Sequence, residues 1–331
     1  MPNPALPFRA YSLPLDGGGS ETWRHSRLVA VVGVRHRPET TEQGRSFTPI
    51  QLRLAAARQG FVSFPHQGGR QKDLRQVGMN DNHSNVPRRR ETMTYVEGFV
   101  VAVPTANREA YRKHAAEAAP LFKEFGVARM VECWGDDVPD GKVNDFKGAV
   151  QAKDDETVVF SWFEYPDRAT RDAANQKMMS DPRMAQMGGE MPFDGKRMII
   201  GGFTSIVDDG TQGKTGYTDG YIVPVPDANK DAYRAMAEKA SQVFRDYGAT
   251  RVVEAWGDDV PDGKVTDYAR AAHKKDGETV VYSWVEWPDK ETRTAGWEKM
   301  MTDERMKPDP DNNPFDGARM IYGGFVPIVE A

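Results

Sequence analysis

The stretch Glu-Cys-Trp-Gly-Asp-Asp-Val-Pro-Asp-Gly-Lys-Val-Asn-Asp-Phe, residues 132–146, decides the fold because it occurs twice. It returns at residues 254–268 as Glu-Ala-Trp-Gly-Asp-Asp-Val-Pro-Asp-Gly-Lys-Val-Thr-Asp-Tyr, 122 positions later. The same offset relates Gly98 to Gly220, and the copies align without an insertion or deletion. One copy is close to the usual size of an independent domain. The sequence therefore predicts a duplicated domain whose two copies each fold around a core and then pair.

Charge is distributed unevenly along the 331-residue chain, whose net charge is −5. Residues 1–92 carry 14 Lys and Arg against 7 Asp and Glu, so the remainder is strongly acidic. An acidic body repels phosphate, which disfavours nucleic-acid binding by the repeats. No run approaches the ~20 apolar residues of a membrane span, and we expect a cytoplasmic protein. The single Cys133 is replaced by Ala255 in the second copy, which excludes a disulfide framework.

The first 92 residues differ from the rest in composition. They contain 13 arginines but one lysine, and no sustained hydrophobic period. We expect this extension to be disordered, or not to be translated, with Met93 as the natural start. The alternative is an Arg-rich arm for RNA or an organelle-targeting peptide. The predicted organisation is an extension (1–92), a first repeat (93–208), a linker (209–218) and a second repeat (219–331).

Hydrophobic patterns within one copy predict the order strand, helix, strand, strand, helix, strand. The expected strands are 95–103, 129–136, 157–165 and 197–207, the expected helices begin near Asn107 and after Asp167, and residues 143–152 are expected to add a short return strand. Helices on one face of a single sheet in this order define the ferredoxin-like plan, βαββαβ. The sequence therefore predicts an α+β fold.

Several motifs carry a resemblance to a known family: Tyr-Val-Glu-Gly-Phe at 95–99, Glu-Cys-Trp at 132–134, Asp-Val-Pro-Asp-Gly-Lys-Val at 137–143 and Pro-Phe-Asp-Gly-Lys-Arg-Met at 192–198. Through them the chain resembles the YbaA-like family, domain of unknown function 1428, over the whole first repeat. The second repeat departs from the pattern, for example at Trp297 where the first has Asn175. The resemblance implies a dimeric α/β barrel, here formed within one chain by two ferredoxin-like units pairing sheet to sheet. It implies no activity.

Aromatic side chains support this pairing on physical grounds. Strand alternation predicts that Trp134, Phe160 and Trp162 lie on the sheet face without helices, as do their counterparts Trp256, Tyr282 and Trp284. Covering one such face contributes roughly 10 kcal/mol before costs. The two faces are therefore expected to meet.

The duplication also filters candidate chemistry, because a site used by both copies must appear twice. His114 aligns with Met236 and His273 with Gln151, so a two-copy histidine metal site or Ser-His-Asp catalysis is disfavoured. We expect no cofactor and no metal. The candidate ligand-binding residues that do occur twice are Glu132, Trp134, Asp136, Glu164 and Arg197, matched by Glu254, Trp256, Asp258, Glu286 and Arg319.

Glu132 is the leading candidate among them. Strand alternation predicts that it faces the space between the sheets beside Trp134, where burial would raise its pKa toward values useful in acid/base chemistry. The alternative is that a buried arginine such as Arg197 holds Glu132 and the pair only fixes strand register. For Asp136 and its acidic neighbours, a solvated turn is favoured over a cation site, since calcium takes 6–8 oxygen ligands.

These observations predict a small-molecule-binding protein with a pocket between or beside the two sheets. Cofactor-independent acid/base or oxygen chemistry is one use of such a pocket, and whether the protein is an enzyme stays open. The alternative is an interaction or stress-related module that docks a protein partner through the acidic turns. The repeats pair within the chain, and further oligomerisation also stays open.

Overall fold

The computed structural model describes residues 94–187, 191–307 and 313–331, and the predictions for residues 1–92 lie outside them. The first copy contains β1 (Tyr95–Pro104), α2 (Arg108–Phe125), β2 (Arg129–Asp137), α3 (Phe146–Ala149), β3 (Glu156–Tyr165), α4 (Arg168–Ser180), α5 (Pro182–Met187) and β4 (Ile199–Gly210). The second copy contains β5 (Tyr217–Pro226), α6 (Lys230–Asp246), β6 (Arg251–Asp259), α7 (Tyr268–Ala271), β7 (Glu278–Trp287), α8 (Lys290–Met300) and β8 (Ile321–Glu330).

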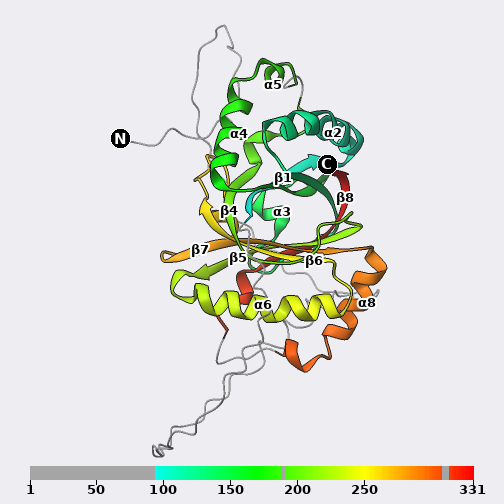
Figure 1. Ribbon diagram of the computed structural model, residues 1–331, viewed down its shortest axis with the longest axis vertical. Coiled ribbons are helices and arrows are strands. Elements are labelled where there is room, and N and C mark those ends of the chain that lie inside the picture. The colour runs from blue at the N-terminus through cyan, green and yellow to red at the C-terminus, as the bar shows by residue number, and fades with distance from the viewer. Residues whose placement is uncertain (1–93, 188–190, 308–312) are drawn as a thin grey trace, which may run out of the picture.

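The strands form one closed barrel in the order β1-β3-β2-β8-β5-β7-β6-β4. Within each copy the four strands are neighbours, and the copies join where β2 pairs with β8 and β4 pairs with β6. Every pairing is antiparallel. Figure 1 shows α2, α4 and α5 on one side of the barrel and α6 and α8 on the other. The α+β class is therefore confirmed, and the edge-to-edge closure is a feature that the sequence did not predict.

The barrel interior is a packed aromatic core. Phe160 stacks on its counterpart Tyr282, and Trp162 stacks on its counterpart Trp284, each with 4.6 Å between ring centroids. All four residues are fully buried, with 0% of their surface exposed to solvent. Equivalent rings of the two copies thus meet face to face, and they fill the central space in which a pocket was expected.

Two glycines allow these rings to approach the strands. A Cβ atom added to Gly220 would lie 2.9 Å from the ring of Phe160, and one added to Gly98 would lie 3.0 Å from the ring of Tyr282. Both distances are shorter than ordinary carbon–carbon contacts. Glycine at these two equivalent positions is therefore a packing requirement of the barrel core.

The predicted orientation of Trp134 and Trp256 is wrong. The inward residues of β2 are Val131 and Cys133, which belong to the interior core. Trp134 packs instead in the core between the sheet and α2, and Trp256 in the matching core under α6. Both faces of this strand carry apolar side chains, so alternation separates two faces without telling which one turns inward.

The predicted return strand at residues 143–152 is also wrong, because this segment contains the short helix α3. The carboxylate of Asp145 caps it by accepting a hydrogen bond from the backbone N–H of Gly148 at 2.7 Å. Phe146 and Ala149, three residues apart, lie on one buried side of the helix. Phe146 contacts Phe160 and Phe325, so α3 closes one end of the barrel.

Candidate acid/base site between helix and sheet

A carboxyl group with two hydroxyl partners lies between β2 and α2 in the first copy. Glu132 projects from the outer face of β2, opposite Ser161 on β3. Its Oε2 atom accepts a hydrogen bond of 2.7 Å from the Tyr111 hydroxyl and a second from the Ser161 hydroxyl. Tyr111 belongs to the apolar face of α2, which holds its hydroxyl over the sheet. We call these three residues the Tyr–Glu–Ser cluster.

The second copy repeats the cluster with the same chemistry. The hydroxyl of Tyr233, on α6, donates to Glu254 Oε2 at 2.7 Å. Ser283, opposite Glu254 in the β6–β7 register, also hydrogen-bonds to this carboxyl. Glu132 is 6% exposed, whereas Glu254 is partly exposed. All three residues of the cluster, and not the glutamate alone, therefore occur in both copies.

Burial sets the protonation of both carboxyl groups. It raises the pKa of Glu132 to about 7, although the hydrogen bonds from Ser161 and Tyr111 oppose the shift. Burial likewise raises the pKa of Glu254 to about 7 against the bonds from its Tyr and Ser partners. The predicted direction of the pKa shift of Glu132 is confirmed, but its predicted position between the sheets is wrong, because Glu132 is buried between the sheet and α2. A carboxyl with a pKa near 7 can donate or accept a proton at neutral pH.

Aromatic and cationic side chains surround each cluster. The Arg108 guanidinium lies 5.8 Å from the ring centroid of Trp134, and the Lys230 ammonium lies 4.9 Å from that of Trp256. The ring of Tyr111 also packs on Phe193 at 5.6 Å. Each strand thus carries, two residues after the cluster glutamate, a tryptophan with a cation over its ring.

The alternative in which Arg197 holds Glu132 is wrong. Arg197 forms a two-bond pair with Glu156 at 2.6 Å, and its counterpart Arg319 pairs with Glu278 at 2.7 Å. The pair is local because the arginine and glutamate lie on adjacent segments at the barrel end. In the described chain no ion pair reaches Glu132.

Glu164 and Glu286 lie inside the barrel, at the end opposite α3. Arg129 binds Glu286 through two hydrogen bonds of 2.8 Å, and Arg251 binds Glu164 through two of 2.9 Å. Burial by itself would raise the pKa of Glu286, but the bonds and charge of Arg129 bring it below the ordinary value. Each arginine therefore joins its own copy to the other, and all four charges are engaged in structural pairs.

Asp136 and Asp258 connect the copies at the surface. Asp136 accepts a hydrogen bond of 2.6 Å from the Lys290 ammonium and one of 2.8 Å from the Tyr217 hydroxyl, and both donors belong to the second copy. Asp258 accepts a hydrogen bond of 2.7 Å from the guanidinium of Arg168 in the first copy. These acidic turns are thus engaged in pairing within the chain, and they lie away from the Tyr–Glu–Ser clusters.

The ten predicted residues therefore fall into four environments: a helix–sheet layer, a barrel end, a surface seam and a local pair. Among the residues that the structure describes, no His, Cys, Asp and Glu side chains gather as a metal site would require. No helix in those same ranges is long and apolar enough to cross a membrane.

Sequence reasoning missed Tyr111 and Ser161 as site residues, and Arg129 and Arg251 as the partners of the buried glutamates. The signal was present, since the tyrosine, the serine and the arginine each recur at the 122-residue offset. Tyr111 was interpreted only as part of an apolar helix face. The arginines stand at strand starts, where nothing in the sequence distinguishes an inward position from a solvated one.

A closed barrel of two fused repeats, each with a buried glutamate under its long helix, is the class of protein defined by this fold and site. The family model described as "Protein of unknown function (DUF1428)" matches residues 94–195 and again 216–317. The chain belongs to this family, as the resemblance predicted.

Similar proteins include one sequence relative and several solved structures. The uncharacterized protein YbaA of Escherichia coli K12 is 68% identical over 117 residues, which are 35% of this chain and 100% of the relative. Among solved structures, a protein provisionally described as a monooxygenase from Fusobacterium nucleatum has a TM-score of 0.44 at 10% identity, covering 72% of this chain and 94% of that one. An anthrone oxidase-like protein has a TM-score of 0.40 at 11% identity, covering 73% and 94%.

Proposed function

We propose that the protein binds a small molecule in the layer between helix and sheet of each copy, and that Glu132 and Glu254 exchange a proton with it. The observation that carries this proposal is the recurrence of the complete Tyr–Glu–Ser cluster in both copies. The hydrogen bonds from Tyr111 and Ser161 to Glu132 both end on Oε2, so Oε1 carries neither of them. That oxygen is the natural point of contact for a ligand hydroxyl or carbonyl.

The chemistry in this proposal is acid/base rather than oxygen chemistry. The groups that meet are a carboxyl with a pKa of about 7, a phenol and an aliphatic hydroxyl, and such a carboxyl is suited to proton transfer at neutral pH. A purely structural carboxylate is usually paired with a cation, as Glu156 is with Arg197, whose hydrogen bonds lower the pKa of Glu156 to about 2. Glu132 contrasts with this pattern.

The alternative function, docking of a protein partner through the acidic turns, has less support. Asp137 lies 3.4 Å from Arg293 and Asp259 lies 2.6 Å from Arg171, besides the pairs of Asp136 and Asp258 described above. Four carboxylates of these turns are thus compensated from within the chain. A partner would have to compete with tethered arginines and lysines.

Three further features belong to the same proposal. Each copy is a ferredoxin-like unit, the units are linked within the predicted segment 209–218, whose ends belong to β4 and β5, and the protein works in the cytoplasm.

Incubation with the low-molecular-mass fraction of a bacterial extract, followed by native mass spectrometry, tests the proposal. Wild type is expected to retain a small molecule that the double variant Glu132→Gln, Glu254→Gln does not retain. The matched control is Glu156→Gln with Glu278→Gln, which makes the same chemical change at a duplicated position outside the clusters. Retention by the first double variant, or by no form of the protein, would contradict the proposal.

A further inference from the structure

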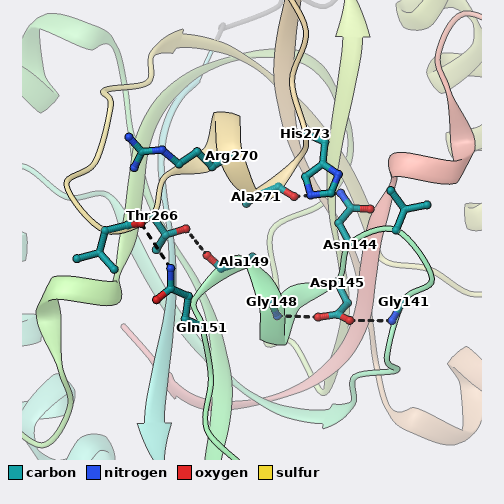
Figure 2. A pocket seen from close by; sticks show the side chains of 12 residues that line it. Gly141, Asn144, Asp145, Gly148, Ala149, Gln151, Thr266, Arg270, Ala271 and His273 are labelled. Atoms are coloured by element: carbon teal, nitrogen blue, oxygen red, sulfur yellow. Dashed lines mark hydrogen bonds between the residues drawn. The ribbon is translucent and has the colours of Figure 1, made fainter. Parts of the chain in front are cut away.

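A cavity of about 290 Å³ lies at the closed end of the barrel, between α3 and α7 (Figure 2). It is separate from the Tyr–Glu–Ser clusters and is lined by both copies. Phe146 and Tyr268, the first residues of the two short helices, are buried beneath it in the interior core. Neither of these two rings is among the residues that line the cavity.

Hydrogen bonds between the copies hold the walls in place. The amide of Asn144 donates to the carbonyl oxygen of Ala271 at 3.0 Å, and the hydroxyl of Thr266 donates to the carbonyl oxygen of Ala149 at 2.7 Å (Figure 2). Asn144 and Thr266 are equivalent positions of the two copies. The cavity thus forms only when the copies pair, and its walls are fixed before any ligand arrives.

Two lining residues have left-handed backbone conformations. Gln151 has φ of 50° and His273, at the equivalent position, has φ of 49°. Non-glycine residues adopt this region infrequently, and it is maintained where the surroundings enforce it. Arg197 and Arg319 do so by donating to the carbonyl oxygens of these residues, at 2.8 and 3.0 Å. The two arginines, predicted to contact a ligand, act here as positioning residues for the cavity wall.

The charged groups of the lining are already compensated. Asp145 accepts hydrogen bonds from the backbone N–H groups of Gly141 and Gly148 at 2.8 and 2.7 Å. Arg270 lies 3.1 Å from Asp267 and donates to the carbonyl oxygen of Gly263 at 2.7 Å. By contrast, no hydrogen bond in the described chain involves the imidazole of His273. What the cavity offers a ligand is thus an imidazole, the Gln151 carboxamide, whose nitrogen lies 3.5 Å from the Val265 carbonyl oxygen, and an apolar wall.

We propose that this cavity is a binding site for a small uncharged planar molecule that carries both a hydrogen-bond donor and an acceptor, such as a primary amide on a ring. The volume is close to the lower end of the range for ligand pockets, about 300 Å³, and suits a single substituted ring. An anionic ligand fits less well, because Asp145 lies in the wall and the one lining guanidinium is engaged by Asp267. The site does not depend on the function proposed for Glu132 and Glu254.

The second copy supplies a variant that closes the site without disturbing the fold. Arg270 stands where the first copy has Gly148, so Gly148→Arg gives α3 the side chain that α7 already carries at the same place. A Cβ atom at Gly148 would lie 3.3 Å from the Asp145 carboxylate, which an exposed cap accommodates. Ala116→Arg, at an exposed position of α2, adds the same charge far from the cavity and serves as the control.

Titration of the full chain with benzamide and with benzoate, followed by ¹H–¹⁵N NMR, is the test. Benzamide is expected to shift the backbone amide signals of Ala149, Gln151 and His273 in wild type and in Ala116→Arg. Benzoate is expected to bind with an affinity at least tenfold weaker. In Gly148→Arg the shifts are expected to vanish while the dispersion of the spectrum persists. Absence of shifts at these residues in wild type, their persistence in Gly148→Arg, or an equal response to benzoate would overturn the proposal.

Discussion

Replacement of Glu132 by glutamine should remove a specific part of the pH dependence of stability. The pKa of this carboxyl is about 7 in the folded chain and 4.5 in the reference state. Between these values the folded chain holds a proton that the unfolded chain has lost, so stability is greatest at acidic pH and falls as the pH rises toward 7. Each pKa unit corresponds to about 1.4 kcal/mol, which predicts a loss of about 2.5 kcal/mol between about pH 5 and about pH 8 from this group.

Urea unfolding of wild type and Glu132→Gln at these two pH values measures the effect. Glutamine is neutral throughout and can still bond to Tyr111 and Ser161, so the variant should lack this contribution to the slope and should be at least as stable as wild type at the higher pH. The control Glu156→Gln should keep the wild-type slope, because the pKa of Glu156 is about 2 and its titration lies below this window. Equal losses of unfolding free energy in wild type and Glu132→Gln would refute the assigned burial of a neutral carboxyl.

Three further predictions concern the fold. Gly220→Ala should lower the free energy of unfolding by about 1–3 kcal/mol, because the added methyl group meets the Phe160 ring. Gly213→Ala should not lower it, because nothing lies within 4 Å of the added methyl group, and equal effects of the two variants in urea titrations would contradict the packing argument. Arg251→Met should lower the free energy of unfolding by about 3–5 kcal/mol, since Glu164 would lose the arginine that binds it through two hydrogen bonds inside the barrel. A loss under about 1 kcal/mol would show that the Glu164 charge is solvated. A fragment of residues 93–210 should form a dimer in light scattering, because its β2 and β4 edges lack the partners β8 and β6; a stable monomer would show that the edges do not drive pairing.

The candidate site was partly predictable. The sequence predicted that Glu132 is buried with a raised pKa, and both are confirmed, but it placed the carboxyl between the sheets, which is wrong. Its partners were not predicted, because Tyr111 and Ser161 lie on different elements and only the helix–sheet contact brings them to one oxygen. The cavity between α3 and α7 was missed for a related reason, since the segment forming its wall was interpreted as a strand.

By itself the sequence determined the duplication, the order of strands and helices, the family, and the residues available in both copies, because these depend on local pattern and on comparison of the chain with itself. The tertiary structure decided which face of β2 turns inward, that the sheets close edge to edge, and which cation meets which carboxylate. Arg129 and Glu286 are 157 residues apart, and their pairing follows from the right strands being adjacent at the barrel end. Alternation along a strand assigns side chains to two faces, but only packing against the rest of the molecule distinguishes the inside of a barrel from the layer under a helix.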